Sequence, residues 1–180
     1  ATLYHYFSDF EELRIFTAMK YLDQYVKDLP AYLRQANRPL EKYLKVWECF
    51  CLHSFSYPDI FWLLFFKHAD TNWDFSYYFH AYYDIFPESW SEETSTYKSM
   101  LSSSNFSERE FLSLTDSLSK EQITLPKSDI YNLATMNIML YRGMLETLRE
   151  DSEYLKVEEA TATTLSFIRR ALASYGIHLD

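Results

Sequence analysis

Hydrophobic residues recur every three or four positions along most of this chain, a spacing that places them on one face of an α-helix. The first such run begins at Phe10 and continues to Leu29, with charged residues on the opposite face. It predicts a helix of about five turns, which Pro30 ends or bends. A second run covers residues 40–55 and follows Pro39, which is favourable in the first turn of a helix.

The middle of the chain changes its pattern twice. Residues 60–66 are apolar on all sides, which predicts a central helix covered on every side. Residues 75–86 form another apolar stripe at helical spacing, and Pro87 closes it. The serine-rich stretch 89–105 is polar, so we expect a loop that contains a weak helix over residues 92–101.

The last third predicts one short and two long helices. Ser107 and Glu110 have the spacing of a capping box, which predicts the start of the short helix. The long helices are expected over residues 128–150 and 157–175, with Gly176 as a left-handed C-terminal cap. Together these patterns predict an all-α fold.

Composition supports this fold and excludes several functions. A chain of 180 residues with 48% hydrophobic residues can bury the core of one domain. Its two glycines are too far apart for a phosphate-binding loop, and no nucleophile, acid–base or cofactor motif is present, so we expect neither an enzyme nor a cofactor. Cys49 and His53 share a helix face but are too few to hold a metal ion. The longest apolar run is too short for a membrane span and no signal peptide is visible, so we expect a cytoplasmic protein.

The first thirteen residues carry the most specific motif. Leu3 and Phe7 are four positions apart and share one face of a helix, whereas the side chains of Thr2, Tyr4, His5 and Tyr6 project elsewhere and can hydrogen-bond to phosphate oxygens. By itself this pattern is equally compatible with a helix end whose aromatic residues pack. The block Thr-Leu-Tyr-His-Tyr-Phe, followed after one residue by a capping Asp, an acidic pair and Leu13, resembles the end of the recognition helix and the start of helix four in tetracycline-repressor (TetR) family regulators.

The resemblance implies a domain organisation and a function. Residues 1–8 would be the remnant of a helix-turn-helix domain that lacks its first part, and Thr2, Tyr4, His5 and Tyr6 would contact the operator backbone. Residues 9–180 would form a ligand-binding and dimerisation domain. The implied function is a ligand-responsive transcriptional regulator, by default a repressor, that binds operator DNA as a homodimer and is released by a small effector. The net charge of −9 is unusual for a nucleic-acid binder and fits a chain whose basic part is absent.

The resemblance also implies that the last two long helices of each subunit form a four-helix dimer interface. The breadth of the apolar surface over residues 128–150 supports this interface independently. Gly143, in the middle of that helix, costs about 1 kcal/mol relative to Ala, and a close helix crossing would compensate for that cost. The simpler alternative is that both helices complete a monomeric bundle.

Aromatic residues make up 19% of the chain and are densest between Trp47 and Trp90. Each of these residues, taken singly, is more often a core residue than a ligand contact. Many large rings together, however, leave irregular gaps between them, and Tyr hydroxyls can supply polar groups in those gaps. A pocket for an apolar or aromatic effector requires both features. In the resembled family this region encloses the effector. The candidate ligand-binding residues are Trp62, Phe65, Tyr78, Tyr82 and Tyr141.

Two rival functions remain. TetR-type proteins usually have a basic residue where this chain has Phe10, and the loss of that phosphate contact favours a TetR-like protein that does not bind DNA and acts through a protein partner. A small helical enzyme that uses an aromatic cavity is the second rival, although the sequence contains no acid, base or nucleophile to assign to it.

Overall fold

The computed structural model describes residues 10–67, 74–87, 90–91, 94–103 and 106–179. These residues form eight α-helices and contain no strand, which confirms the all-α fold class. The helices are α1 (Phe10–Leu33), α2 (Pro39–Ser56), α3 (Pro58–Phe65), α4 (Phe75–Ile85), α5 (Ser95–Leu101), α6 (Phe106–Lys120), α7 (Lys127–Glu150) and α8 (Val157–Ser174).

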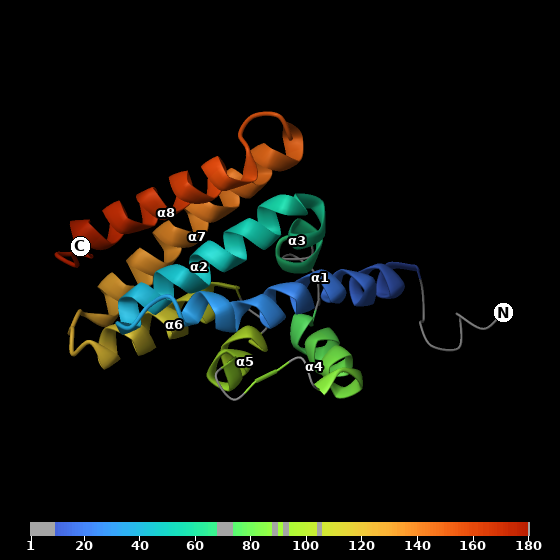
Figure 1. Ribbon diagram of the computed structural model, residues 1–180, viewed down its shortest axis with the longest axis horizontal. Coiled ribbons are helices and arrows are strands. Elements are labelled where there is room, and N and C mark those ends of the chain that lie inside the picture. Colours follow the sequence, from blue (N-terminus) through green and yellow to red (C-terminus); the bar gives the residue numbers. More distant parts are fainter. Residues whose placement is uncertain (1–9, 68–73, 88–89, 92–93, 104–105, 180) are drawn as a thin grey trace.

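The helices are arranged around the neighbouring pair α1 and α2 (Figure 1). The long helices α7 and α8 pack against each other on one side of this pair, and both contact α2. Helices α4 and α5 lie on the other side, where α4 contacts α1 and α5 contacts α6. Helix α3 contacts both α1 and α7, so it links the two sides at one end of the molecule.

Aromatic rings fill the centre of the core. Tyr141 of α7 is completely buried, and its ring centroid lies 5.2 Å from that of Phe50 and 5.5 Å from that of Trp47, both on α2. Its ring also stacks on Phe55 and lies 5.6 Å from Phe106 of α6. Ring pairs at these separations add favourable edge and offset contacts to the burial of apolar area. This cluster therefore joins α2, α6 and α7.

Pro30 does not end the first helix, because α1 continues to Leu33. The ring removes one backbone donor, but the amide of Arg34 still donates to the carbonyl of Pro30 at 3.1 Å. Leu29 and Leu33 are both buried, so the additional turn contributes apolar contacts that offset the missing hydrogen bond.

Helix α3 is not covered on every side, contrary to the expectation from its apolar sequence. Its buried residues are Phe61, Leu63 and Leu64, whereas Trp62 and Phe65 are only partly buried. The outer face of Trp62 is covered by cations, since the guanidinium carbons of Arg149 and Arg142 lie 4.4 Å and 5.2 Å from its ring centroid. Cation–π contacts of this kind cover a ring without apolar neighbours.

The expected capping box at the start of α6 is also wrong. The helix begins at Phe106, and Glu110 is buried in the core instead of reaching back to the helix start. The C-terminal cap of α8 is confirmed. Gly176 has a φ of 77°, its amide donates to Ala173, and the amide of Ile177 donates to Leu172 at 3.1 Å. This is the hydrogen-bond pattern of a Schellman cap, which favours glycine at the position of positive φ.

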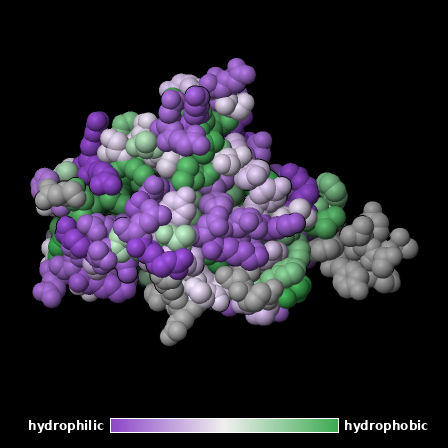
Figure 2. Space-filling model, viewed as in Figure 1, coloured by the Kyte–Doolittle hydropathy of each residue, from purple (hydrophilic) through white to green (hydrophobic). Residues whose placement is uncertain are grey.

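The surface in the view of Figure 2 is mostly polar, with smaller apolar areas between the polar side chains. Within the described ranges, none of the helices combines the length and the apolar character that crossing a membrane requires.

Candidate ligand-binding site

A cavity of about 70 Å³, partly open to solvent, lies among α1, α2, α5 and α6. Most of its wall is apolar, and the charged residues on it are Arg109 and Glu110 of α6. The remaining lining residues are Tyr25, Val46, Trp47, Phe50, Tyr97, Met100, Leu101, Phe106 and Ser113. An apolar cavity with a small number of polar groups is the usual form of a small-molecule site.

Glu110 is held in a buried network of hydrogen bonds that connects three helices. Its Oε1 accepts from the hydroxyl of Tyr43 on α2 and, at 3.1 Å, from Nδ2 of Asn137 on α7. Asn137 Nδ2 also lies 2.7 Å from the Tyr43 hydroxyl. Burial raises the pKa of Glu110 to about 7, although these hydrogen bonds oppose the shift. Glu110 is therefore partly protonated near neutral pH.

Arg109 is buried beside this network, with only 6% of its surface exposed. Its Nε donates to the carbonyl of Ser103 at 2.6 Å. The guanidinium carbon lies 4.0 Å from the ring centroid of Phe75 and 5.0 Å from that of Phe65. Burial lowers the pKa of Arg109 to about 9, so the side chain remains charged at neutral pH.

The structure separates the five predicted ligand residues into three places, and none of them is on the cavity wall. Phe65 and Tyr141 lie directly behind it, because both rings contact Phe50 and Phe106, which do line the cavity. Tyr78 and Tyr82 belong to α4, where Tyr82 packs against Phe16 of α1. Trp62 lies on the outer side of α3 under the two arginines of α7.

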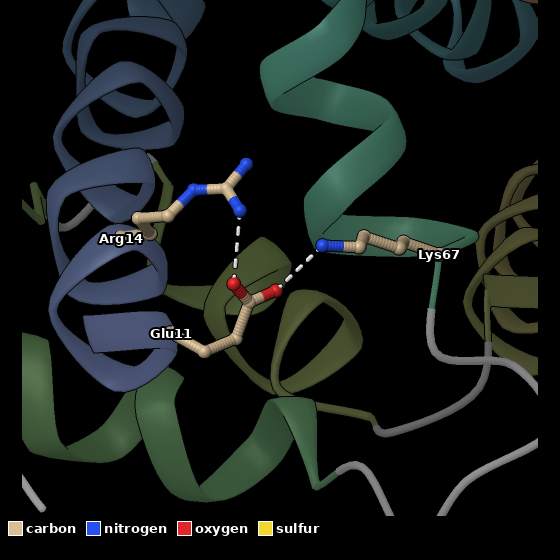
Figure 3. A network of polar contacts seen from close by, with 3 residues as sticks. All are labelled: Glu11, Arg14 and Lys67. Atoms are coloured by element: carbon tan, nitrogen blue, oxygen red, sulfur yellow. Dashed lines mark hydrogen bonds and ion pairs between the residues drawn. The ribbon is translucent and has the colours of Figure 1, made fainter. Parts of the chain in front are cut away.

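The predicted operator contacts Thr2, Tyr4, His5 and Tyr6 lie outside the described residues. The first described residue is Phe10, which lies in the first turn of α1, and 72% of its side chain is exposed. In that turn Glu11 accepts from Arg14 at 2.9 Å and from Lys67, which follows α3, at 2.7 Å (Figure 3). The start of α1 is thus held against the end of α3.

Beside this turn, α1 and α3 form a shallow groove of about 380 Å³. Its wall is mainly apolar, with Phe10, Leu13 and Tyr21 on α1 and Ile60 and Leu63 on α3. The groove and the exposed ring of Phe10 leave apolar surface at the start of α1.

The outer faces of α7 and α8 carry exposed apolar side chains. On α7, Met139 is 68% exposed and Met136 40% exposed, and on α8 Phe167 is 38% exposed. Gly143 shares the face of Met136 and Met139, and a Cβ added there would meet no atom within 4 Å. Among the described residues, no other helix comes close enough to Gly143 to explain a glycine at this position.

Cys49 and His53 do not share a site. The thiol of Cys49 is directed at the carbonyl of Tyr25, while His53 Nε2 lies 3.1 Å from Asp28 Oδ2. Burial lowers the pKa of His53, and Asp28 opposes that shift. Over the part of the chain that the structure describes, no group of three or more His, Cys, Asp or Glu residues is placed to hold a metal ion.

Sequence reasoning missed Arg109 and Glu110, which are the charged residues of the cavity. In the sequence they stand in a polar run with Ser107 and Glu108, which is typical of an exposed helix start. The one available signal is their position immediately before the apolar residues Phe111 and Leu112, and it does not distinguish a buried charge from an exposed one.

The comparisons with known proteins identify no relative. The chain matches no protein-family model, no curated protein and no solved structure.

Proposed function

We propose that this chain is the regulatory region of a ligand-responsive transcriptional regulator of the TetR type, by default a repressor. A small effector with a hydrophobic body occupies the cavity among α1, α2, α5 and α6. The effector shifts α1, and with it the helix-turn-helix domain that the first residues resemble, so that a homodimer leaves its operator.

The observation that carries this proposal is the presence of α1 on the cavity wall. Tyr25 of α1 lines the cavity, and the same helix begins at Phe10, within the TetR-like block of residues 1–13. Fifteen residues separate the two positions, which is about 22 Å along an α-helix. A helix of this length transmits a displacement at the cavity to its other end, provided that the effector binds one position of α1 more tightly than the other.

The exposed face of α7 and α8 supports the homodimer. Met136, Met139 and Phe167 form exposed apolar surface on the two helices that the resemblance assigns to the interface. A twofold axis through such an interface would place two recognition helices to meet successive major grooves.

The test is a titration of the full gene product against the DNA upstream of its gene at 50 mM and 200 mM salt, with and without a panel of hydrophobic compounds. Binding that weakens with salt and is abolished by a compound would support the proposal, because phosphate contacts are salt-dependent. Binding that no compound changes would argue against a ligand-responsive regulator.

The second candidate is a TetR-like protein that acts through a protein partner without binding DNA. The groove between α1 and α3 favours it, because the exposed Phe10 and the apolar residues beside it offer a surface for a partner. Absence of DNA binding at 50 mM salt, together with loss of partner capture when Phe10 is replaced by Lys, would favour this candidate over the repressor.

A further inference from the structure

In the part of the chain that the structure describes, Arg109 is a buried cation without an anionic partner. Among the described residues, no carboxylate lies within ion-pair distance of its guanidinium, and Nη1 is buried with no hydrogen-bond acceptor. The hydrogen bond from Nε to Ser103 uses one of the five N–H groups that a guanidinium carries. Burial of an unpaired charge is unfavourable, so a partner for this charge would stabilise the folded chain.

The surrounding rings replace such a partner only in part. Phe75, Phe65 and Phe106 surround the guanidinium, with distances of 4.0 Å, 5.0 Å and 5.9 Å from its carbon to their ring centroids. Ring faces attract a cation, but they accept no strong hydrogen bonds from its edge. The rings therefore hold the guanidinium in place, but they supply no hydrogen-bond acceptor for Nη1.

Glu110 does not supply that acceptor, although it is the next residue. Consecutive helix residues point in different directions, and Glu110 is bound to Tyr43 and Asn137 on the side of α2 and α7. Burial raises its pKa to about 7, so it is largely uncharged below neutral pH. The cavity wall thus carries a net positive charge from Arg109.

The rest of the wall restricts the kind of anion. Val46, Phe50, Met100 and Leu101 are apolar, and the cavity of about 70 Å³ is narrow. A single buried cation balances a single negative charge, whereas a phosphate dianion would bring one unbalanced charge into an apolar wall. A carboxylate also matches the planar donor edge of a guanidinium with two parallel hydrogen bonds.

We propose that the ligand of this cavity is a carboxylate with an apolar tail, whose head binds Arg109 and whose tail runs along Val46, Met100 and Leu101 towards the open side. This inference rests on the proposed effector function and names the chemical class of the effector. Arg109 is then the residue that selects acids over amides and amines of the same shape.

The test measures binding to this 180-residue chain by calorimetry at pH 7, without DNA. The probes are straight-chain carboxylates from acetate to decanoate and the amide and amine of each chain length. We expect at least one carboxylate to bind tenfold or more tightly than its amide and its amine. Equal affinity for acid and amide, preference for the amine, or no binding by any carboxylate would overturn the proposal.

Variants locate the binding site. Arg109→Gln should remove the preference for the acid, while Arg142→Gln, which replaces an exposed arginine beside Trp62, should leave it unchanged. A preference that persists in Arg109→Gln would overturn the assignment. If that variant does not fold, a photoreactive diazirine carboxylate locates the site in the unmodified chain. Crosslinks should map to the cavity wall, which includes Val46, Phe50, Met100, Leu101 and Arg109, and crosslinks confined to residues away from this wall would refute the proposal.

The two proposals fail separately. A carboxylate that binds at Arg109 but does not release operator DNA from the full gene product would leave this inference standing and contradict the repressor function. Release of operator DNA by neutral compounds, with no preference for acids, would support the repressor function and contradict this inference.

Discussion

Lys67 Nζ lies 2.7 Å from Glu11 Oε1, and this ion pair joins the second residue after α3 to the first turn of α1. Glu11 also accepts from Arg14, so its carboxylate is shared between the two helices (Figure 3). Phe65, two residues before Lys67, packs against Phe50 and Phe106 on the cavity wall. The start of α1 is therefore connected to the cavity through α3 as well as through the length of α1 itself.

Replacing Lys67 with Gln should loosen the first turn of α1 without unfolding the protein. Both partners are partly exposed, so the pair contributes at most about 1 kcal/mol. We expect hydrogen exchange in a peptide covering residues 10–18 to become up to about fivefold faster, because that energy corresponds to such a factor in local opening. Lys20→Gln, an exposed change farther along α1, is the matched control. Unchanged exchange in the Lys67 variant would show that the pair does not hold this turn.

Replacing Glu110 with Gln should stabilise the protein above pH 7 and remove part of its pH dependence. The pKa of Glu110 rises from 4.5 to about 7 on folding, so the folded state binds the proton more tightly. Stability from this group is complete below about pH 4.5, falls as pH rises, and is lost above about pH 7, with a total on the order of 3 kcal/mol. Gln keeps an oxygen that can accept from Tyr43 and Asn137.

Urea unfolding of both proteins between pH 5 and pH 8 measures this effect. The difference in the free energy of unfolding should favour the Gln variant increasingly as the pH rises. Parallel pH profiles for the two proteins would show that Glu110 does not titrate in this range.

Replacing Gly143 with Ala distinguishes a dimer from a monomer. In one chain the added methyl group meets no atom within 4 Å, so a monomer should gain about 1 kcal/mol from the better helix former. If a partner helix crosses closely at Gly143, as the dimer proposal requires, the methyl group should weaken association instead. We expect the dissociation constant from analytical ultracentrifugation to rise about tenfold, which corresponds to 1.4 kcal/mol. Ser119→Ala, on α6, is the control. Greater stability without any change in association would contradict the dimer.

Replacing Tyr141 tests whether this residue is part of the core or binds ligand. Tyr141→Ala should lower the free energy of unfolding by about 3–5 kcal/mol, because it removes a completely buried ring that contacts Phe50 and Phe55. Tyr141→Phe keeps the ring and should leave carboxylate binding within about twofold, since Tyr141 does not line the cavity. Loss of carboxylate binding in a folded Tyr141→Phe protein would show that the Tyr141 hydroxyl contacts the ligand.

The all-helical fold could be predicted from local patterns. The 3.6-residue spacing of apolar residues located the helices that became α1, α2, α7 and α8, and Gly176 marked the end of α8. These features depend on residues a few positions apart, so the sequence alone contains the information that determines them.

Only the tertiary structure decided which charged residues are buried and which rings face the cavity. The hydrogen bonds of Glu110 and Asn137 to Tyr43 span 67 and 94 positions of the sequence. Periodicity shows that Arg109 and Glu110 lie on a helix, but it cannot show that α2, α4 and α7 bring partners to them. The free energy of burying a charge depends on those partners, and the packing of distant helices provides them.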